Sequence, residues 1–566
     1  MVGTDEAGGG CDAGADETRP DEAGADETGP DEAGADEMGP DETRADETAT
    51  VEVGTDDAGR YRRRAEVTLD GEWLVTRRPL SAMRLNPAAV AAVEALDSET
   101  FTTPAAVAEQ TGVDPAAVRR LFDSLHDRGV LAWDPPETPT HRPPVSVVVT
   151  VRDQREHLRA CLDALSALSY PEYEVVVVDD GSTDGTAAMA REYVLEATGP
   201  LRVVEVGTAE EPLGIGASRN RGVEAAAHDV IAFTDADCRP SAGWLADLVG
   251  HLTHCDLVGG RVRPHGDAAV DAYEGLHSSL DMGPRPARVD PDSATPYLAT
   301  ANLVGRREVF ETIQFPDRSV AEDVDLCWRA LAQGHEAVYV PSGTVEHAFD
   351  PDVRSLVRRR QRYGGSEALL AREYGHGDSV PVSAGGSLAA VLLVVVWLAW
   401  FIPLPVAGSP AVALGVTGAM LGGLLGGRLA ARAYRLRGLV SLPSVAASVA
   451  REHLSTWYAV TRELTRYYSF PLGTLALALG GGGLFGGEPA LACVGMGLGA
   501  ATVAAVALPV TVEYHIHRPD LFPTRYAGWY LADHLGYQWG VYRGALVHRT
   551  VAHVAPWRRF AVVLPR

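Results

Sequence analysis

Continuous apolar runs alternate with amphipathic segments in the middle of the chain. Residues 145–150 read V-S-V-V-V-T and residues 173–178 read Y-E-V-V-V-V, which is typical of strands buried on both faces. Between them, residues 157–168 carry apolar side chains at helical spacing. This pattern predicts an α/β domain over residues 145–375, with a parallel sheet covered on both faces. Such sheets bind ligands beyond the carboxyl ends of their strands.

A smaller domain is predicted ahead of it, at residues 60–134, followed by a Pro- and Thr-rich linker at residues 135–144. Two helices joined by a tight turn lead into a strand, which is the outline of a winged helix. Acidic residues offset the arginines of its last helix, so peptide recognition is favoured, and DNA binding stays the alternative. The expected strand, three helices and second strand occupy residues 72–75, 87–96, 103–112, 116–128 and 129–131.

Residues 1–59 have almost no large apolar side chains. They form a degenerate ten-residue repeat in which Asp16, Asp26, Asp36 and Asp46 hold equivalent places. Residues 1–60 contain 20 acidic side chains against 3 arginines. Such a segment has no apolar surface to bury, so we predict a disordered acidic tail without chemistry of its own.

Four apolar segments follow the α/β domain, within residues 384–512. The first and last are long enough to span a bilayer, at roughly 20 residues each. Arginines are concentrated at residues 428–468 and in a basic tail at residues 513–566, so two hairpins would place both stretches on the side of the α/β domain. This predicts a cell-membrane protein whose α/β domain faces the cytoplasm; a shallow monotopic anchor is the alternative. The segments lie near residues 384–406, 409–427, 470–486 and 489–512.

The overall composition narrows the classes of partner and compartment. The formal net charge is -27, and every basic residue is an arginine or a histidine, which indicates a salt-loving, haloarchaeal source. No polybasic surface for nucleic acid is predicted. The six cysteines show no C-x-x-C spacing, so reduced thiols are expected in place of a zinc site or a disulfide framework.

A pair of carboxylates marks the end of a third apolar run. Residues 230–233 are a predicted buried strand, and Asp235 and Asp237 follow it two positions apart. Alternate residues of an extended chain point the same way, so the two carboxylates should lie on one side. Two like charges at the edge of a core need a positive partner, and a hard cation such as Mg²⁺ or Mn²⁺ suits carboxylate oxygens.

Two other segments offer groups that suit a nucleotide and a diphosphate. Asp179 and Asp180 end the second predicted strand, where a carboxylate can accept hydrogen bonds from a base or ribose. Arg219 and Asn220 stand at the start of a predicted helix, where free amides and a guanidinium suit a diphosphate.

A third acidic pair, Glu322 and Asp323, begins another predicted helix. A carboxylate at a helix N-terminus is expected to stay ionised, because the dipole and free amides favour the charge. Asp323 is therefore our candidate general base towards an acceptor hydroxyl, with Asp325 as the next carboxylate to test.

Basic and imidazole groups follow near the end of the domain. His347 ends a short predicted strand and could complete a metal shell. The run at residues 358–364 includes Arg359 and Arg362, which would attract a pyrophosphate or face anionic lipid.

In this order and on one α/β pattern, these motifs resemble family-2 glycosyltransferases of the GT-A fold, a Rossmann-like class of nucleotide-diphospho-sugar transferases. The resemblance implies an inverting transfer in which Asp180 holds the nucleotide, Asp323 is the base and Glu322 orients the acceptor. Asp235 and Asp237 would bind the metal and diphosphate. The Q-x-x-R-W motif of processive members is approximated at residues 359–363, with Arg for Gln and Tyr for Trp, which leaves processive polymerisation open.

Residues 70–566 as a whole resemble the mycofactocin-system glycosyltransferases. The resemblance is carried by the winged-helix outline, the string at residues 273–283, the acidic helix start at residues 321–329 and the Arg-rich apolar tail. It implies transfer of glucose from UDP-glucose to a peptide-derived redox cofactor, mycofactocin, or its precursor. Two alternatives remain: a membrane-bound transferase acting on a polyprenyl phosphate or cell-surface glycan, and a non-enzymatic winged-helix regulator.

Overall fold

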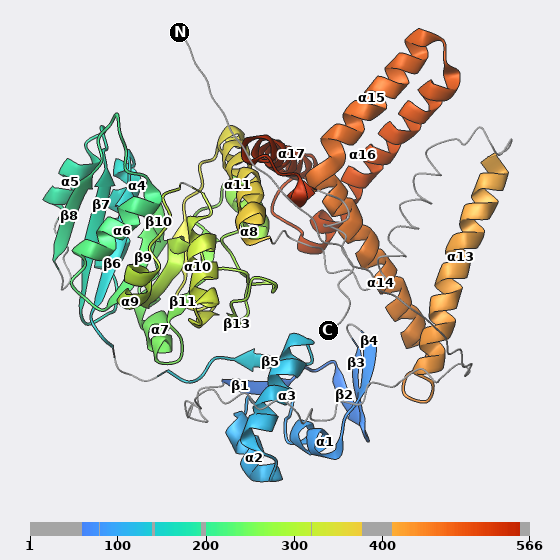
Figure 1. Cartoon of the computed structure of the whole chain (residues 1–566), viewed down its shortest axis with the longest axis horizontal. Coiled ribbons are helices and arrows are strands. Elements are labelled where there is room, and N and C mark those ends of the chain that lie inside the picture. Colours follow the sequence, from blue (N-terminus) through green and yellow to red (C-terminus); the bar gives the residue numbers. More distant parts are fainter. Residues whose placement is uncertain are drawn as a thin grey trace, which may run out of the picture.

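The computed structural model describes residues 59–77, 80–138, 142–193, 200–318, 320–375 and 410–554. Figure 1 shows three bodies: the small N-terminal domain, a central α/β domain and a set of long C-terminal helices. The predicted acidic tail, the first apolar segment at residues 384–406 and the end of the basic tail lie outside the described residues.

An eight-stranded sheet forms the core of the central domain. Strands β9, β6, β7 and β8 are parallel, as the apolar runs predict, but β14 is antiparallel to both of its neighbours and β13 is antiparallel to β15. The expectation of a wholly parallel sheet is therefore wrong. A short 3₁₀ turn, η2 (Thr300–Asn302), leads directly into β14 and so fixes the direction in which the chain enters the sheet. In spatial order the strands are β13 (Ala287–Arg288), β15 (Ala337–Tyr339), β11 (Leu257–Gly259), β14 (Leu303–Arg306), β9 (Val230–Asp235), β6 (Val145–Val151), β7 (Tyr173–Asp180) and β8 (Leu201–Val206).

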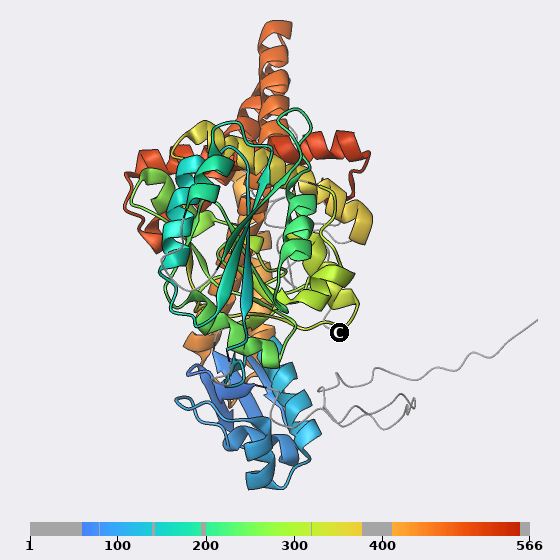
Figure 2. The same cartoon turned by 90° about the vertical axis from the view of Figure 1, so that its left-hand side faces the viewer.

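Helices cover both faces of this sheet, as Figure 2 shows. Along β6, Val147 and Val149 belong to the apolar cluster that contains α4, α5 and α7, whereas Val148 belongs to the cluster of α6, α9 and α10. This alternation is the period of two expected for a strand buried on both sides. The helices are α4 (Arg155–Ser166), α5 (Thr186–Glu192), α7 (Trp244–Leu248), α6 (Ile215–Ala225), α9 (Arg307–Thr312) and α10 (Glu322–Ala332).

The small domain contains the three predicted helices, each with proline in its first turn. Asn86, Thr103 and Asp114 cap them by accepting a hydrogen bond from a backbone N–H three residues on. Its assignment as a winged helix stays a prediction. The elements are β1 (Arg60–Arg63), β2 (Val67–Asp70), β3 (Trp73–Arg77), β4 (Leu80–Arg84), α1 (Pro87–Glu94), α2 (Pro104–Thr111), α3 (Pro115–Asp127) and β5 (Leu131–Asp134).

The C-terminal helices are joined to the central domain through α11 (Val353–Tyr374). This helix runs parallel to α17 (Pro523–His548), with Gln361 against Gly540 and Gly365 against Gly544. A Cβ at Gly540 would lie 2.1 Å from the Gln361 carbonyl oxygen, so only glycine allows this approach. The other helices are α13 (Pro410–Arg435), α14 (Leu442–Glu463), the π-helical turn η4 (Leu464–Tyr468), α15 (Ser469–Gly486) and α16 (Pro489–His517).

Two stretches of the described helices are long and apolar enough to cross a bilayer. They are Leu442–Gly486, with mean hydropathy 1.3, and Pro489–His517, with mean hydropathy 2.1. They contain the third and fourth predicted segments, whereas the second, near residues 409–427, falls in α13, which is not one of the two. In Figures 1 and 2 the hairpin of α15 and α16 projects away from the other two bodies.

Candidate active site

The predicted nucleotide carboxylates lie at the carboxyl end of β7 and hold the neighbouring backbone. Asp180 accepts hydrogen bonds from the N–H groups of Leu213 (2.6 Å) and Gly214 (2.9 Å), just before α6. Asp179 accepts one from Ser182 N–H at 3.0 Å, but its other oxygen, Oδ1, is buried without a hydrogen-bond partner. A buried acceptor without a partner is costly, so Asp179 Oδ1 is available for a donor group of a ligand.

Arg219 occupies the centre of the site. Its Nη2 lies 3.0 Å from Asp235 Oδ1 and its Nη1 lies 2.6 Å from Glu322 Oε1, while its side chain is 3% exposed. Burial disfavours its charge, but Asp235 and Glu322 outweigh burial, and the pKa of Arg219 is raised. The guanidinium therefore joins the D-x-D segment, which is Asp235 to Asp237, to the acidic start of α10.

Asp323 lies beside that ion pair and is half-buried, and its pKa is shifted. Its Oδ1 accepts the backbone N–H of Val324 at 2.8 Å. Burial and then the charge of Glu322 raise the pKa of Asp323 to about 7, against the lowering effect of Arg219. This differs from the expectation that the helix N-terminus keeps the group ionised, because the dipole does not outweigh burial beside a second carboxylate.

Asp237 and His347 come together because β10 (Cys238–Pro240) pairs antiparallel with β16 (Val345–His347), placing Cys238 opposite His347. Asp237 Oδ1 and His347 Nε2 are 3.5 Å apart, and one ligand atom each of Asp237, Cys238 and His347 lie within 4.8 Å of one another. His347 Nδ1 is buried without a hydrogen-bond partner. The carboxylate and imidazole suit a hard divalent cation better than the thiol does, so Asp237 and His347 fit such an ion.

The three remaining candidate residues from the sequence, Asn220, Arg359 and Arg362, lie at separate places. Asn220 exchanges two hydrogen bonds of 2.9 Å with the backbone of Phe315, so it fixes the loop before α10. Arg359 is paired with Glu274 and stacks on the Phe349 ring at 4.8 Å. Arg362 is exposed in a groove between α11 and α17.

Two side chains near these groups had no role assigned from the sequence. Burial raises the pKa of Tyr363 against the lowering effect of Arg359 and Arg360, and the charge of Asp323 adds to the rise. Glu274, in α8 (Ala269–His277), binds both Arg359 and Arg360 and its side chain is fully buried. The same helix also carries Asp271, so the sequence around Glu274 does not distinguish it from a surface charge.

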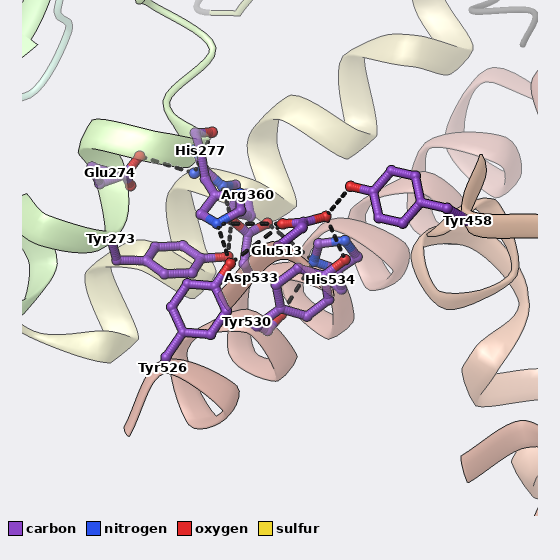
Figure 3. Close-up of polar contacts among 10 residues, drawn as sticks. All are labelled: Tyr273, Glu274, His277, Arg360, Tyr458, Glu513, Tyr526, Tyr530, Asp533 and His534. Carbon is purple, nitrogen blue, oxygen red and sulfur yellow. Dashed lines mark hydrogen bonds and ion pairs between the residues drawn. The ribbon is translucent and has the colours of Figure 1, made fainter. Parts of the chain in front are cut away.

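A second buried polar cluster joins α8, α11, α14, α16 and α17 (Figure 3). Arg360 binds Glu274 Oε2 and Asp533 Oδ2, both at 2.9 Å, and Tyr273 also donates to Asp533. Glu513 accepts from the hydroxyls of three tyrosines, of which the shortest hydrogen bond, from Tyr458, is 2.5 Å. We call these residues the joint cluster: Tyr273, Glu274, His277, Arg360, Tyr458, Glu513, Tyr526, Tyr530, Asp533 and His534.

The mixed sheet, with acidic groups at the ends of β7 and β9 and at the start of α10, is a glycosyltransferase fold. Residues 146–314 match the model of glycosyl transferase family 2. The pre-mycofactocin glycosyltransferase of Mycobacterium tuberculosis H37Rv is 32% identical over 427 residues, covering 74% of this chain and 81% of that protein. The chain therefore belongs to the family-2 glycosyltransferases, in the group that includes the pre-mycofactocin enzyme, and it is an enzyme of that class.

Two further proteins are similar to parts of this chain. Glycosyltransferase AglE of Haloferax volcanii is 32% identical over 231 residues, covering 39% of this chain and 72% of that protein. A solved mannosyltransferase from Pyrobaculum calidifontis, in complex with GDP-Man and Mn²⁺, has 20% identity and a TM-score of 0.39, covering 72% of this chain and 90% of that chain.

Proposed function

We propose that this enzyme transfers a sugar, glucose from UDP-glucose, to the peptide-derived redox cofactor mycofactocin or its precursor, with inversion at the sugar. The observation that carries this proposal is the position of Arg219. It holds the D-x-D carboxylate Asp235 and the acceptor-side carboxylate Glu322 within one guanidinium of each other. Donor and acceptor groups would therefore meet at this arginine, beside Asp323.

On the donor side, three carboxylates and an imidazole have different tasks. Asp179 Oδ1 would accept a donor group of the nucleotide, and Asp180 shapes the backbone before α6 that faces it. Asp237 and His347 would hold Mg²⁺ or Mn²⁺, which neutralises the departing diphosphate when bound. Arg359, held by Glu274, supplies a further positive charge.

On the acceptor side, Asp323 would accept the proton of the attacking hydroxyl. Its pKa of about 7 matches a general base that works near neutral pH. Glu322 is held by Arg219 and would orient the acceptor with its second oxygen. With one base and no second carboxylate in the role of nucleophile, the transfer would be a single displacement.

The acceptor assignment draws on the relative from Mycobacterium tuberculosis, which is named for pre-mycofactocin, and on the small N-terminal domain as a site for peptide. The two long apolar helical stretches support attachment to the cell membrane. The arginine-rich stretches at residues 428–468 and 513–566 are the reason to propose the cytoplasmic side for the catalytic domain. The apolar stretches also favour the second candidate, an acceptor that resides in the membrane, such as a polyprenyl phosphate.

The test is transfer from UDP-glucose to purified pre-mycofactocin, followed as a mass increase of one hexose or more. We expect activity in Mg²⁺ or Mn²⁺, loss on chelation and loss in Asp237→Asn. Asp292→Asn is the matched control, because Asp292 is exposed in a loop and its carboxylate has no role in the site. Transfer to a polyprenyl phosphate but not to pre-mycofactocin would select the second candidate. Full activity without metal would contradict the roles of Asp237 and His347.

A further inference from the structure

Helix α17 has apolar side chains on both of its faces. One face is packed: Tyr537 and Val541 are buried against α11 and η4. The other face is bare and follows helical spacing of four, four and seven residues, so its members form one stripe. They are Leu531 (40% exposed), Leu535 (46%), Trp539 (59%) and Leu546 (81%).

The orientation of α17 indicates which surroundings this exposed apolar stripe meets. In Figures 1 and 2 the helix lies at the base of the α15–α16 hairpin and runs across the direction of the hairpin. The hairpin also exposes large apolar side chains, among them Leu477 (78%) and Phe485 (96%). A helix that crosses the base of a membrane-inserted hairpin lies along the bilayer surface, where an apolar stripe with a tryptophan is stable.

A groove of about 280 Å³ opens between α17 and α11. Three of its lining residues are arginines: Arg318, Arg362 and Arg543. Arg318 is held by Asp325 and Glu373, but within the described chain neither Arg362 nor Arg543 makes an ion pair, and both are exposed. The groove therefore presents two uncompensated positive charges to whatever fills it.

Arg543 connects the groove to the bare stripe. It lies four residues after Trp539 and four before Val547, so the three side chains are neighbours on one face of α17. Trp539 and Val547 are 59% and 64% exposed. A ligand in the groove thus meets a guanidinium beside apolar side chains, which matches a phosphate attached to acyl chains better than a free anion.

We propose that the groove between α11 and α17 binds the phosphate group of an anionic membrane lipid, through Arg362 and Arg543. This inference rests on the proposed membrane attachment and adds to it a specific site and a preference for headgroup. It gives Arg362, which the sequence offered for either pyrophosphate or lipid, the second of these roles.

The experiment compares Arg543→Glu with Arg525→Glu in the full-length protein. Arg525 is exposed on α17 and lies 18 residues before Arg543, which is five turns of helix, so it is on the same face but away from the groove. Native mass spectrometry of the detergent-purified protein would measure retention of phosphatidylglycerol, phosphatidylcholine and inorganic phosphate. We expect the parent to retain phosphatidylglycerol preferentially, Arg543→Glu to weaken that retention about fivefold or more, and Arg525→Glu to leave it unchanged.

Several results would overturn the lipid site. These are equal retention of the two lipids, equal losses in the two variants, or complete competition by inorganic phosphate at the concentration of the lipid. Sedimentation of the parent with neutral vesicles tests the membrane attachment separately. If the parent does not sediment with them, both the membrane attachment and the lipid site are wrong, whereas the proposed sugar transfer is not affected. Arg543→Gln, with an unchanged melting temperature and unchanged turnover in detergent, keeps the test valid if the charge reversal misfolds.

Discussion

Two buried arginines in this molecule each stand between two carboxylates, and they differ in what surrounds them. Arg219 lies between Asp235 and Glu322, in the candidate active site. Arg360 lies between Glu274 and Asp533, in the joint cluster of Figure 3. Both pairs of carboxylates come from elements distant in sequence, so each arginine ties separate parts of the chain together.

The difference lies in the excess of negative charge. Around Arg360, a second arginine also binds Glu274, and a tyrosine hydroxyl also binds Asp533. Burial would raise the pKa of Asp533, but the charge of Arg360 and its neighbours lowers it. Around Arg219 a third carboxylate, Asp323, has its pKa raised to about 7. A compensated cluster holds structure, whereas an overcrowded one keeps a group poised to exchange a proton.

Neutral donors complete the joint cluster. Burial lowers the pKa of His277 to about 4 and that of His534 to about 3, so neither imidazole carries charge near neutral pH. Glu513 is held by tyrosine hydroxyls, and His277 lies 3.6 Å from it. The joint cluster therefore relies on hydrogen bonds and on arginines, and we expect it to respond little to pH between 6 and 8.

Asp323→Asn has the largest expected effect, because it changes the surroundings of Arg219 and leaves those of Arg360 untouched. Removing a general base costs about 100- to 10,000-fold in turnover, while binding of UDP should survive because the donor-side residues are untouched. Asp325→Asn is the matched control: Arg318, Arg329 and Tyr374 hold Asp325, so its loss should lower stability more than turnover. Steady-state kinetics with calorimetric UDP binding would measure both. Near-parental turnover in Asp323→Asn would show that the base lies elsewhere.

The second prediction concerns a substitution that disrupts the joint cluster. Arg360→Met leaves Glu274 and Asp533 buried without their shared partner, which should lower the free energy of unfolding by about 3–5 kcal/mol. Arg358→Met, two residues earlier on the exposed face of α11, should change it by less than about 1 kcal/mol. Denaturant unfolding in detergent would compare the two. Similar losses in both variants would mean that the cluster does not stabilise the joint.

The sequence carries more local signals for the residues of the candidate active site than for those of the joint cluster. The candidates Asp180, Asp235 and Asp323 follow apolar strands or begin a helix, and short-range rules place such groups at the same edge of a sheet. Glu274, Arg360 and Asp533 are separated by up to 259 positions, and nothing local distinguishes them from surface charges.

The sequence predicted neither the antiparallel direction of β14 nor the ion pairs of Arg219, and the two failures have related reasons. β14 has the same apolar character as its parallel neighbours, so its direction depends on how the chain enters it, which composition does not show. Arg219 was expected to face a diphosphate, because a helix start suggests an anion site. Its ion pairs with Asp235 and Glu322 depend on how the end of β9 and the start of α10 lie beside α6, which no spacing rule encodes.

A third prediction tests how closely the joint is packed. In Gly540→Ala the new Cβ would lie 2.1 Å from the Gln361 carbonyl oxygen, so α11 and α17 must separate, at a cost of about 1–3 kcal/mol. Gly528→Ala, on the same helix with nothing within 4 Å of the new Cβ, should be neutral or slightly stabilising. Thermal unfolding would rank them. If Gly540→Ala matches Gly528→Ala, the helices do not pack in this way.

The smallest expected effect is a pH dependence that belongs to the site and not to the joint. Because the pKa of Asp323 is raised to about 7, the base is mostly protonated at pH 6 and mostly ionised at pH 8. Turnover relative to KM should therefore rise about tenfold between these two values. The sign for stability is opposite. A carboxyl whose folded pKa lies above its unfolded value stabilises the fold at low pH, and this contribution is lost as pH rises from about 4 to 7. Asp323→Asn should flatten that loss in unfolding experiments, whereas Arg360→Met should leave its slope unchanged. A parental rate that is flat from pH 6 to 8 while chemistry limits turnover would contradict the raised pKa.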